Sequence, residues 1–213
     1  MIRVRVTYNK NHSLRYISSL DNHKLWERTI RRANLPLAYS QGFHPQPKIN
    51  QVLPLPLGMT SKGDLIDIWF EEDISITKIR SALTKHIHSG IEIINLEEVD
   101  LLSPKLQSII QDAEYEVNIF EQFSIQNVQD SIDKMLETEN IQRSRSGKLY
   151  NLRPLIISMN ILVQDTFETL TLTLRLSASA GATGRPDEVV SALGFDPNQA
   201  MIERTKLFLS DQS

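Results

Sequence analysis

The chain of 213 residues contains no cysteine. This absence excludes disulfides, thiol nucleophiles, iron–sulfur clusters held by the chain's own thiolates and zinc sites with cysteine ligands. Histidine is also scarce: the five histidines are scattered, and none forms an H-x-x-x-H pair with an acid between its members. We therefore expect no metal site and no bound cofactor.

Long apolar runs are missing too. No segment approaches the ~20 apolar residues needed to cross a bilayer, and the opening MIRVRVTYNK alternates apolar and polar side chains instead of forming the apolar block of a signal peptide. We therefore expect a cytoplasmic protein without a membrane partner. With 40% hydrophobic and 23% charged residues, the composition fits one large or two small globular domains.

The net charge is only −3, but the charges are distributed unevenly along the chain. Residues 1–50 carry nine Lys or Arg against two acids, whereas residues 51–142 carry six against seventeen. The segment 143–153, RSRSGKLYNLR, adds four basic residues and no acid. Such asymmetry is typical of a protein with a basic surface that faces a polyanion.

The first half of the chain predicts the order β-α-β-β-α-β. Alternation over 2–8 indicates a strand, and apolar residues at helical spacing after the N-cap candidates at 18–21 indicate a helix that ends before Pro36. Two strands are expected over 48–53 and 65–70. Ser75 then suits the N-cap of a second helix that ends at Gly90, and the apolar stretch after it predicts a fourth strand.

The second half repeats this order after a connector that contains Pro104. We expect a strand over 114–119, a helix over 125–136, a hairpin turning at 146–147, strands over 154–163 and 168–176, a helix that begins at Pro186, and a strand over 202–210. The predicted fold is α+β, with two tandem ferredoxin-like (β-α-β-β-α-β) units that have antiparallel sheets, over residues 1–103 and 112–213. One larger α+β sandwich is the alternative.

Three segments resemble a known family: RYISSLDNHKLWERTIRRANLPLAYSQGFHPQPKINQVLPLPLGMTSKGDLIDI at 15–68, YNLRPLI at 150–156 and GRPDEVVSALGFDP at 184–197. Their combination of A-Y-S-Q-G-F, P-x-P-K and L-P-L-P-L-G resembles the radical-SAM-associated family of uncharacterised bacterial proteins, which are encoded beside or fused to radical SAM proteins. The resemblance covers nearly the whole chain. It implies a radical SAM protein as partner, which would hold the cluster cysteines. More distantly, the chain resembles repeat-associated RNA-binding proteins built from tandem ferredoxin-like domains.

Basic side chains on the first predicted helix form a stripe at i, i+4, i+7 and i+8, which consists of Lys24, Arg28, Arg31 and Arg32. The stripe is a candidate phosphate-binding surface. The alternative is an ordinary solvated helix face in which Glu27 pairs with Arg31. Arg3 and Arg5, on one face of the first strand, add to the cationic set. The remaining basic candidates for nucleic-acid binding are Arg15, Lys48, Arg143, Arg145, Lys148 and Arg153.

The segment 38–58, AYSQGFHPQPKINQVLPLPLG, holds four of the nine prolines. Prolines fix φ and remove amide donors, so we expect a preorganised loop that cannot join a central sheet and is less costly to order on binding. Tyr39 and Phe43 are candidates for stacking on bases, with Gln41 and Lys48 as polar contacts. The alternative is that both aromatic rings anchor the loop to the core.

His44 is the single catalytic candidate, because an imidazole can act as general base on a ribose 2′-hydroxyl without a metal. No partner acid is visible in the sequence, and a surface or structural histidine is the alternative. The segment 180–186, AGATGRP, is interpreted as a turn and helix cap instead of an anion site, because Asp187 and Glu188 already complement the helix dipole.

These observations predict a non-catalytic, RNA-binding accessory protein that acts with a radical SAM enzyme in RNA modification, for example of tRNA. Its expected partners are that enzyme and RNA. Two alternatives stay open. One is a protein–protein adaptor that docks the radical SAM partner through its acidic middle segment and prolines, and the other is a metal-independent ribonuclease that uses His44.

Overall fold

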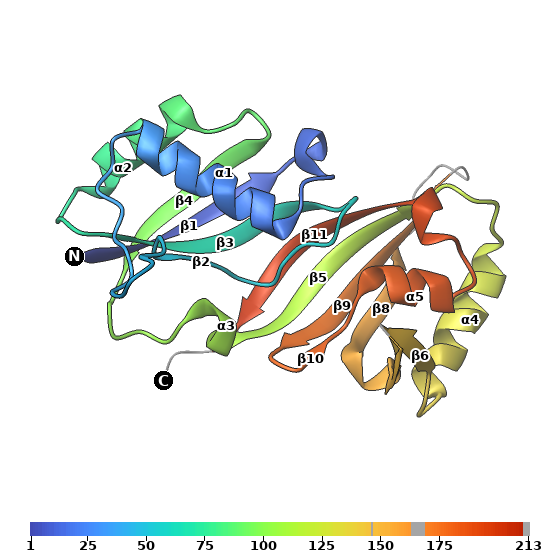
Figure 1. The fold of residues 1–213 in the computed structure, drawn as a ribbon. Coiled ribbons are helices and arrows are strands. Elements are labelled where there is room, and N and C mark those ends of the chain that lie inside the picture. Colours follow the sequence, from blue (N-terminus) through green and yellow to red (C-terminus); the bar gives the residue numbers. More distant parts are fainter. Residues whose placement is uncertain (146, 163–168, 211–213) are drawn as a thin grey trace. The chain divides into compact units, whose positions relative to one another are not determined.

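The structure is a computed structural model, and it describes residues 1–145, 147–162 and 169–210. The chain divides into two compact units, Met1–Ile109 and Ile110–Ser213 (Figure 1). Both combine helices with mainly antiparallel strands, so the predicted α+β class is confirmed. Ser146, Val163 and Glu168, which belong to the predicted hairpin turn and strands, lie outside the described residues. No described helix is long and apolar enough to cross a membrane.

The first unit contains β1 (Ile2–Lys10), the 3-10 turn η1 (His12–Leu14), α1 (Ser19–Arg32), β2 (Ile49–Gln51), β3 (Thr60–Phe70), α2 (Ile76–His86), β4 (Ile91–Val99) and α3 (Leu106–Ile109). β1 pairs antiparallel with β3 on one side and β4 on the other, and β2 pairs antiparallel with β3. The strands of this unit therefore lie in the order β2–β3–β1–β4. Within the described chain, β4 is an edge strand.

Local signals decide where the helices begin and end. The hydroxyls of Ser18 and Ser75 each accept a backbone N–H in the first turn of α1 and α2, as expected for N-caps. After α1, Asn34 takes the left-handed φ of 51°, which asparagine tolerates, and the chain turns before Pro36. The second helix ends at His86 and not at the predicted Gly90.

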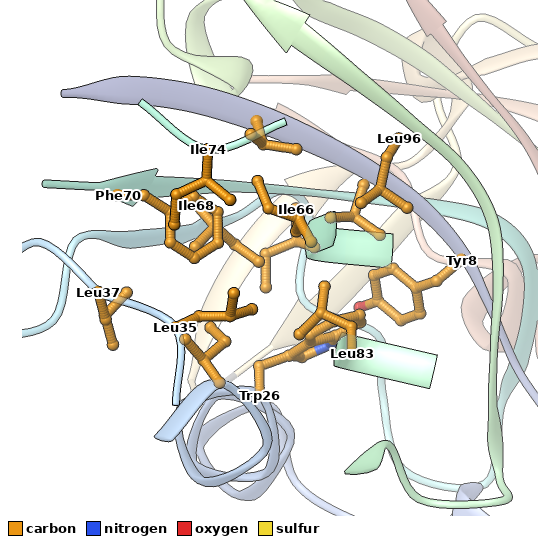
Figure 2. Packing of buried hydrophobic residues seen from close by; sticks show 14 of the residues in the cluster. Tyr8, Trp26, Leu35, Leu37, Ile66, Ile68, Phe70, Ile74, Leu83 and Leu96 are labelled. Atoms are coloured by element: carbon orange, nitrogen blue, oxygen red, sulfur yellow. The ribbon is translucent and has the colours of Figure 1, made fainter. Parts of the chain in front are cut away.

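The core of the first unit lies between its sheet and its two long helices (Figure 2). Val4 and Val6 of β1 are fully buried against Trp26 and Ile30 of α1, because alternate residues of a strand face the same side. The Tyr8 ring meets the Trp26 ring edge-on, with centroids 5.0 Å apart. This packing turns the polar face of α1 to solvent.

The opposite face of β1 carries a buried ion cluster. Arg3 and Arg5 are only 1% and 6% exposed, and both donate to the carboxylate of Asp67. The Nε atoms of the two arginines each lie 2.9 Å from an Asp67 oxygen, and the Arg3 guanidinium also donates to the carbonyls of Ser103 and Pro104. The prediction that Arg3 and Arg5 add to a cationic surface is therefore wrong, because the register places Asp67 opposite Arg5.

The second unit contains β5 (Ile110–Ile119), α4 (Ile125–Glu137), β6 (Gln142–Arg145), β7 (Lys148–Asn151), the 3-10 turn η2 (Arg153–Leu155), β8 (Ile156–Leu162), β9 (Leu170–Ser179), β10 (Ala182–Thr183), α5 (Pro186–Ala192), the 3-10 turn η3 (Pro197–Gln199) and β11 (Ala200–Leu209). β9 pairs antiparallel with β8 and β5, and β5 pairs antiparallel with β11. The order β8–β9–β5–β11 repeats that of the first unit. The β6–β7 hairpin was expected, whereas the two-residue β10 was not.

The two units also place their longest insertions at the same point. In the first unit, the proline-rich segment connects the first helix, α1, to the second strand, β2. In the second unit, the β6–β7 hairpin lies in the corresponding connection, between α4 and β8. The proline-rich segment and the basic β6–β7 hairpin are therefore insertions at the same position in an order of elements that the two units share.

Replacing Asp67 with asparagine is expected to lower the free energy of unfolding by about 3–5 kcal/mol, because two buried guanidinium groups lose their ion-pair partner. Urea unfolding followed by circular dichroism measures this loss. The matched control is Asp73→Asn, which removes an exposed carboxylate and should change stability by less than about 0.5 kcal/mol. Equal stability of the two variants would contradict the structural role of the cluster.

Candidate nucleic-acid interface

The outer face of α1 presents most of the basic stripe. Lys24 and Arg28 are exposed and form no ion pair or hydrogen bond with any residue that the structure describes. Arg32 is exposed as well and donates to the backbone carbonyl of His86 at 3.2 Å, a contact that does not neutralise its charge. These three side chains form a cationic surface, which we call the α1 basic face.

Arg31 has a different environment. Its guanidinium pairs with Glu27 at 2.9 Å, as the alternative interpretation of the stripe expected, and donates to the Tyr39 hydroxyl at 3.1 Å. The hydrogen bond to Tyr39 and, after it, the charge of Glu27 raise the pKa of Arg31 above its ordinary value. Arg31 thus connects α1 to the loop that follows it.

That loop, residues 38–48, is a closed hairpin, which we call the proline loop. Tyr39 and Pro47 form an antiparallel bridge. The Ser40 amide donates to the Gln46 carbonyl at 2.8 Å, and the Gln46 amide donates to the Ser40 hydroxyl at 2.9 Å. Tyr39 is half-buried and packs against the core, so its anchoring role is confirmed. The loop is preorganised by its own hydrogen bonds.

The tip of the proline loop extends into solvent. Phe43 has a relative exposure of 103%, so the interpretation of this ring as an anchor is wrong. Gln41 and His44 beside it are exposed too, and Gly42 takes a φ of 131°, which side chains with a Cβ rarely adopt. The turn therefore presents an aromatic ring that contributes nothing to the core.

His44 lacks the surroundings of a general base. Its ring has no hydrogen-bond or ion-pair partner in the described chain, and its backbone carbonyl accepts from Gln46 Nε2 at 3.4 Å. Catalytic bases are normally oriented by a second group. The described structure contains no such group for this ring.

Two further basic candidates of the first unit lie in more restricted positions. Lys48 is half-buried, with its Nζ 3.9 Å from the Met1 sulfur. Arg15 contacts the His12 ring and lies over the Tyr16 ring, 4.6 Å from its centroid. Both side chains are held by neighbours that do not neutralise their charge.

The basic segment of the second unit is the β6–β7 hairpin. Arg145 and Lys148 face each other across it and are exposed. Arg143 donates to the Glu188 carbonyl at 3.0 Å and lies 3.7 Å from its carboxylate, and Arg153 donates to backbone carbonyls at the end of α4 and the start of β8. Arg143 and Arg153 therefore position the hairpin, whereas Arg145 and Lys148 present their charges to solvent.

A pocket of about 450 Å³ lies beside this hairpin, and the sequence did not reveal it. Its lining includes Arg145 and Tyr150 of the hairpin, Leu155 of η2, Gly181 of the turn after β9, and both residues of β10. Gly184 allows the chain after this turn to approach η2, because a Cβ there would lie 3.0 Å from the Leu155 carbonyl oxygen. The glycines of AGATGRP are the one signal in the sequence, and by themselves they predict a turn and a helix cap.

The first unit has a smaller pocket, of about 30 Å³, at the start of α1. The Asn22 Oδ1 and Gln51 Nε2 atoms belong to residues that line it, and both atoms are buried without a hydrogen-bond partner in the described protein. A pocket of this volume suits a water molecule and is too small for a nucleotide. Within the described residues, no group of three or more His, Asp or Glu side chains could hold a metal ion.

A family model matches residues 3–186, which include the α1 basic face, the proline loop and the β6–β7 hairpin. Its description is "Uncharacterized protein conserved in bacteria (DUF2344)". The chain belongs to this family. No curated protein matches the chain.

Two of the solved structures to which this DUF2344 protein is similar are complexes that contain Cbf5 and Nop10. A chain of a Cbf5–Nop10–Gar1 complex has a TM-score of 0.51 and 10% identity over 98% of this chain and 50% of that chain. A chain of an archaeal box H/ACA sRNP Nop10–Cbf5 complex has a TM-score of 0.48 and 9% identity over 95% of this chain and 47% of that chain. The protein thus spans about half the length of these chains, and the first likeness supports its α+β fold.

The Tyr150 hydroxyl offers a pH test of the pocket geometry. Burial and, after it, the charge of Glu188 raise the pKa of Tyr150 above its ordinary value of 10.0. A raised folded-state pKa contributes stability that is present below the unfolded pKa and is lost as the pH rises through the folded pKa. Tyr150→Phe should therefore lose less stability than the wild type as the pH rises above about 10, as measured by urea unfolding. Tyr16→Phe, at an exposed position, is the control, and identical losses in all three proteins would contradict the assignment.

Proposed function

We propose that this DUF2344 protein is a non-catalytic, RNA-binding accessory protein. One observation carries the proposal: Arg31 connects the α1 basic face to a rigid loop whose tip exposes Phe43 completely. Cations on a helix bind a phosphate backbone, and exposed rings stack on unpaired bases. The combination favours single-stranded over duplex RNA, because stacking needs bases that are accessible.

The candidate contacts differ in the roles that their surroundings support. Lys24, Arg28 and Arg32 suit phosphate contacts because no described acid neutralises them. Phe43 suits stacking on a base. Additional contacts in this proposal are Arg15, Gln41, Lys48, Arg145 and Lys148, and positioning residues are Arg31, Tyr39, Arg143 and Arg153, whose polar groups already bind other parts of the protein.

We propose further that residues 1–103 and 112–213 each form a ferredoxin-like domain. In both units the third strand lies between the first and the second, so that it splits the first β-α-β connection. The identical strand order supports this proposal. Tandem domains of this kind would give an RNA two separate binding surfaces.

A radical SAM protein is the proposed protein partner, in an RNA-modifying system. The resemblance of residues 15–68 to the radical-SAM-associated family motivates this proposal. One structural observation favours an adaptor role as the second candidate function: Glu92, Glu97 and Glu98 are exposed on the edge strand β4. An acidic edge repels RNA and complements a basic protein surface. The ribonuclease alternative has no comparable support, since no described residue orients His44.

Neutralising the α1 basic face should reduce the salt dependence of RNA binding. For Lys24→Gln combined with Arg28→Gln, the slope of log K against log salt should fall in magnitude by about 1.4, because about 0.7 counterions are released per phosphate contact on a single strand. Fluorescence anisotropy with a labelled single-stranded RNA, titrated across a salt series, measures the slope.

The matched control for this experiment removes two other exposed cations, by Lys105→Gln combined with Lys134→Gln. It should leave the slope unchanged. If the wild type does not bind RNA at low salt, or binds with no salt slope, the RNA-binding proposal fails and the adaptor role is favoured.

Removing the exposed ring at the tip of the proline loop should weaken binding without affecting the salt slope. Phe43→Ala is expected to cost about 1–3 kcal/mol of affinity for single-stranded RNA, the range for loss of one base–aromatic stack. The same anisotropy assay measures it, with a duplex of equal length as comparison. Leu57→Ala, which shortens another exposed apolar side chain of this unit, is the control. An unchanged affinity of Phe43→Ala would exclude stacking on this ring.

A further inference from the structure

The pocket beside the β6–β7 hairpin has a charge balance that suits one anionic group. Around it, Arg143 lies 3.7 Å from Glu188, and Arg185 pairs with Asp187 at 2.6 Å. Arg145 lines the pocket, is exposed, and has no ion-pair partner in the part of the chain that the structure describes. A ligand therefore meets a single guanidinium whose charge is not compensated.

Beside this cation the pocket offers aromatic and apolar surface. The half-buried ring of Tyr150 and the side chain of Leu155 contribute to the lining. The Tyr150 hydroxyl forms no hydrogen bond to any described residue, so it is available to a ligand. A ring with a free hydroxyl next to an apolar side chain suits a nucleobase, which is flat and has a polar edge.

The lining is held in place by hydrogen bonds that leave Arg145 and Tyr150 free. The Asn151 Oδ1 atom accepts from the amides of Ile141 and Arg153, at 2.8 and 3.1 Å, and thereby joins the two ends of the hairpin. Thr183 donates to the Ser179 carbonyl at 3.3 Å across the opposing turn. Such support lowers the cost of ordering the pocket when a ligand binds.

We propose that this pocket binds one unpaired nucleotide, with its phosphate on Arg145 and its base against Tyr150. The volume of about 450 Å³ lies within the range of about 300–1,000 Å³ typical of small-molecule sites. The inference rests on the proposed function, because a bound RNA is the source of the nucleotide. A free phosphate would contact only Arg145, whereas a nucleotide would contact both Arg145 and the Tyr150 ring.

Titration of the full chain with AMP and UMP, observed through the ligand proton NMR signals, tests the proposal. Both mononucleotides should bind saturably, and their base protons should shift upfield through stacking. Adenosine and ribose 5-phosphate, which each lack one of the two recognised groups, should bind more weakly. Arg145→Gln should weaken AMP binding about fivefold, the loss of one exposed charge pair.

Lys134→Gln is the matched control, because Lys134 is an exposed cation of α4 in the same unit and does not line the pocket. Its AMP affinity should stay within about twofold of the wild type. Tyr150→Leu should abolish the upfield shift, whereas Tyr150→Phe should retain it. Circular dichroism checks that each variant is folded. If Tyr150→Leu does not fold, the comparison of Arg145→Gln with its control variant tests the proposal by itself.

Three results would overturn the inference. Ribose 5-phosphate that binds as tightly as AMP would reveal a simple anion site, and equal losses in the Arg145 and Lys134 variants would reveal diffuse charge attraction. If RNA binds in a salt-dependent manner but mononucleotides do not bind, the pocket is not a nucleotide site and the proposed function is unaffected. Conversely, mononucleotide binding that depends on Arg145, without RNA binding, would support the pocket and contradict the RNA-binding role.

Discussion

The shared carboxylate of Asp67 is the contact on which the arrangement of the first unit depends. It accepts hydrogen bonds from Arg3 and Arg5 where water has no access. A slip of β1 by one residue would turn both arginines into the apolar core, so the ion cluster permits one register only. With that register, the apolar side of β1 meets α1. The helix must then direct its basic residues outward, which creates the cationic face.

The proline loop shows how rigidity and exposure are combined in one segment. Its base is fixed three times: by the Tyr39–Pro47 bridge, by the hydrogen bonds between Ser40 and Gln46, and by packing of the Tyr39 ring on the core. Such fixation removes most of the conformational entropy that a free loop would lose on binding. The ring of Phe43 takes no part in this fixation, and a phenyl group held in water is a feature that folding alone does not favour.

The two units use one connectivity and differ in what they insert at the same place. The connection between the first helix and the second strand holds the proline loop in one unit and the β6–β7 hairpin in the other. Connections of this kind tolerate insertion because the framework is stabilised by its own core. The first insertion presents an exposed ring, and the second borders a pocket.

The sequence by itself determined the order of the main helices and strands and the caps at Ser18 and Ser75, because each depends on a few neighbouring residues. Tertiary structure alone decided which cations are free. From the sequence alone, Arg5 and Arg28 are both candidate surface cations. In the structure, Arg5 is buried against the carboxylate of Asp67, 62 residues away. Likewise, Leu155 and Gly181 line one pocket only because distant segments pack together. The burial of a residue depends on such long-range contacts, and local sequence patterns do not predict these contacts.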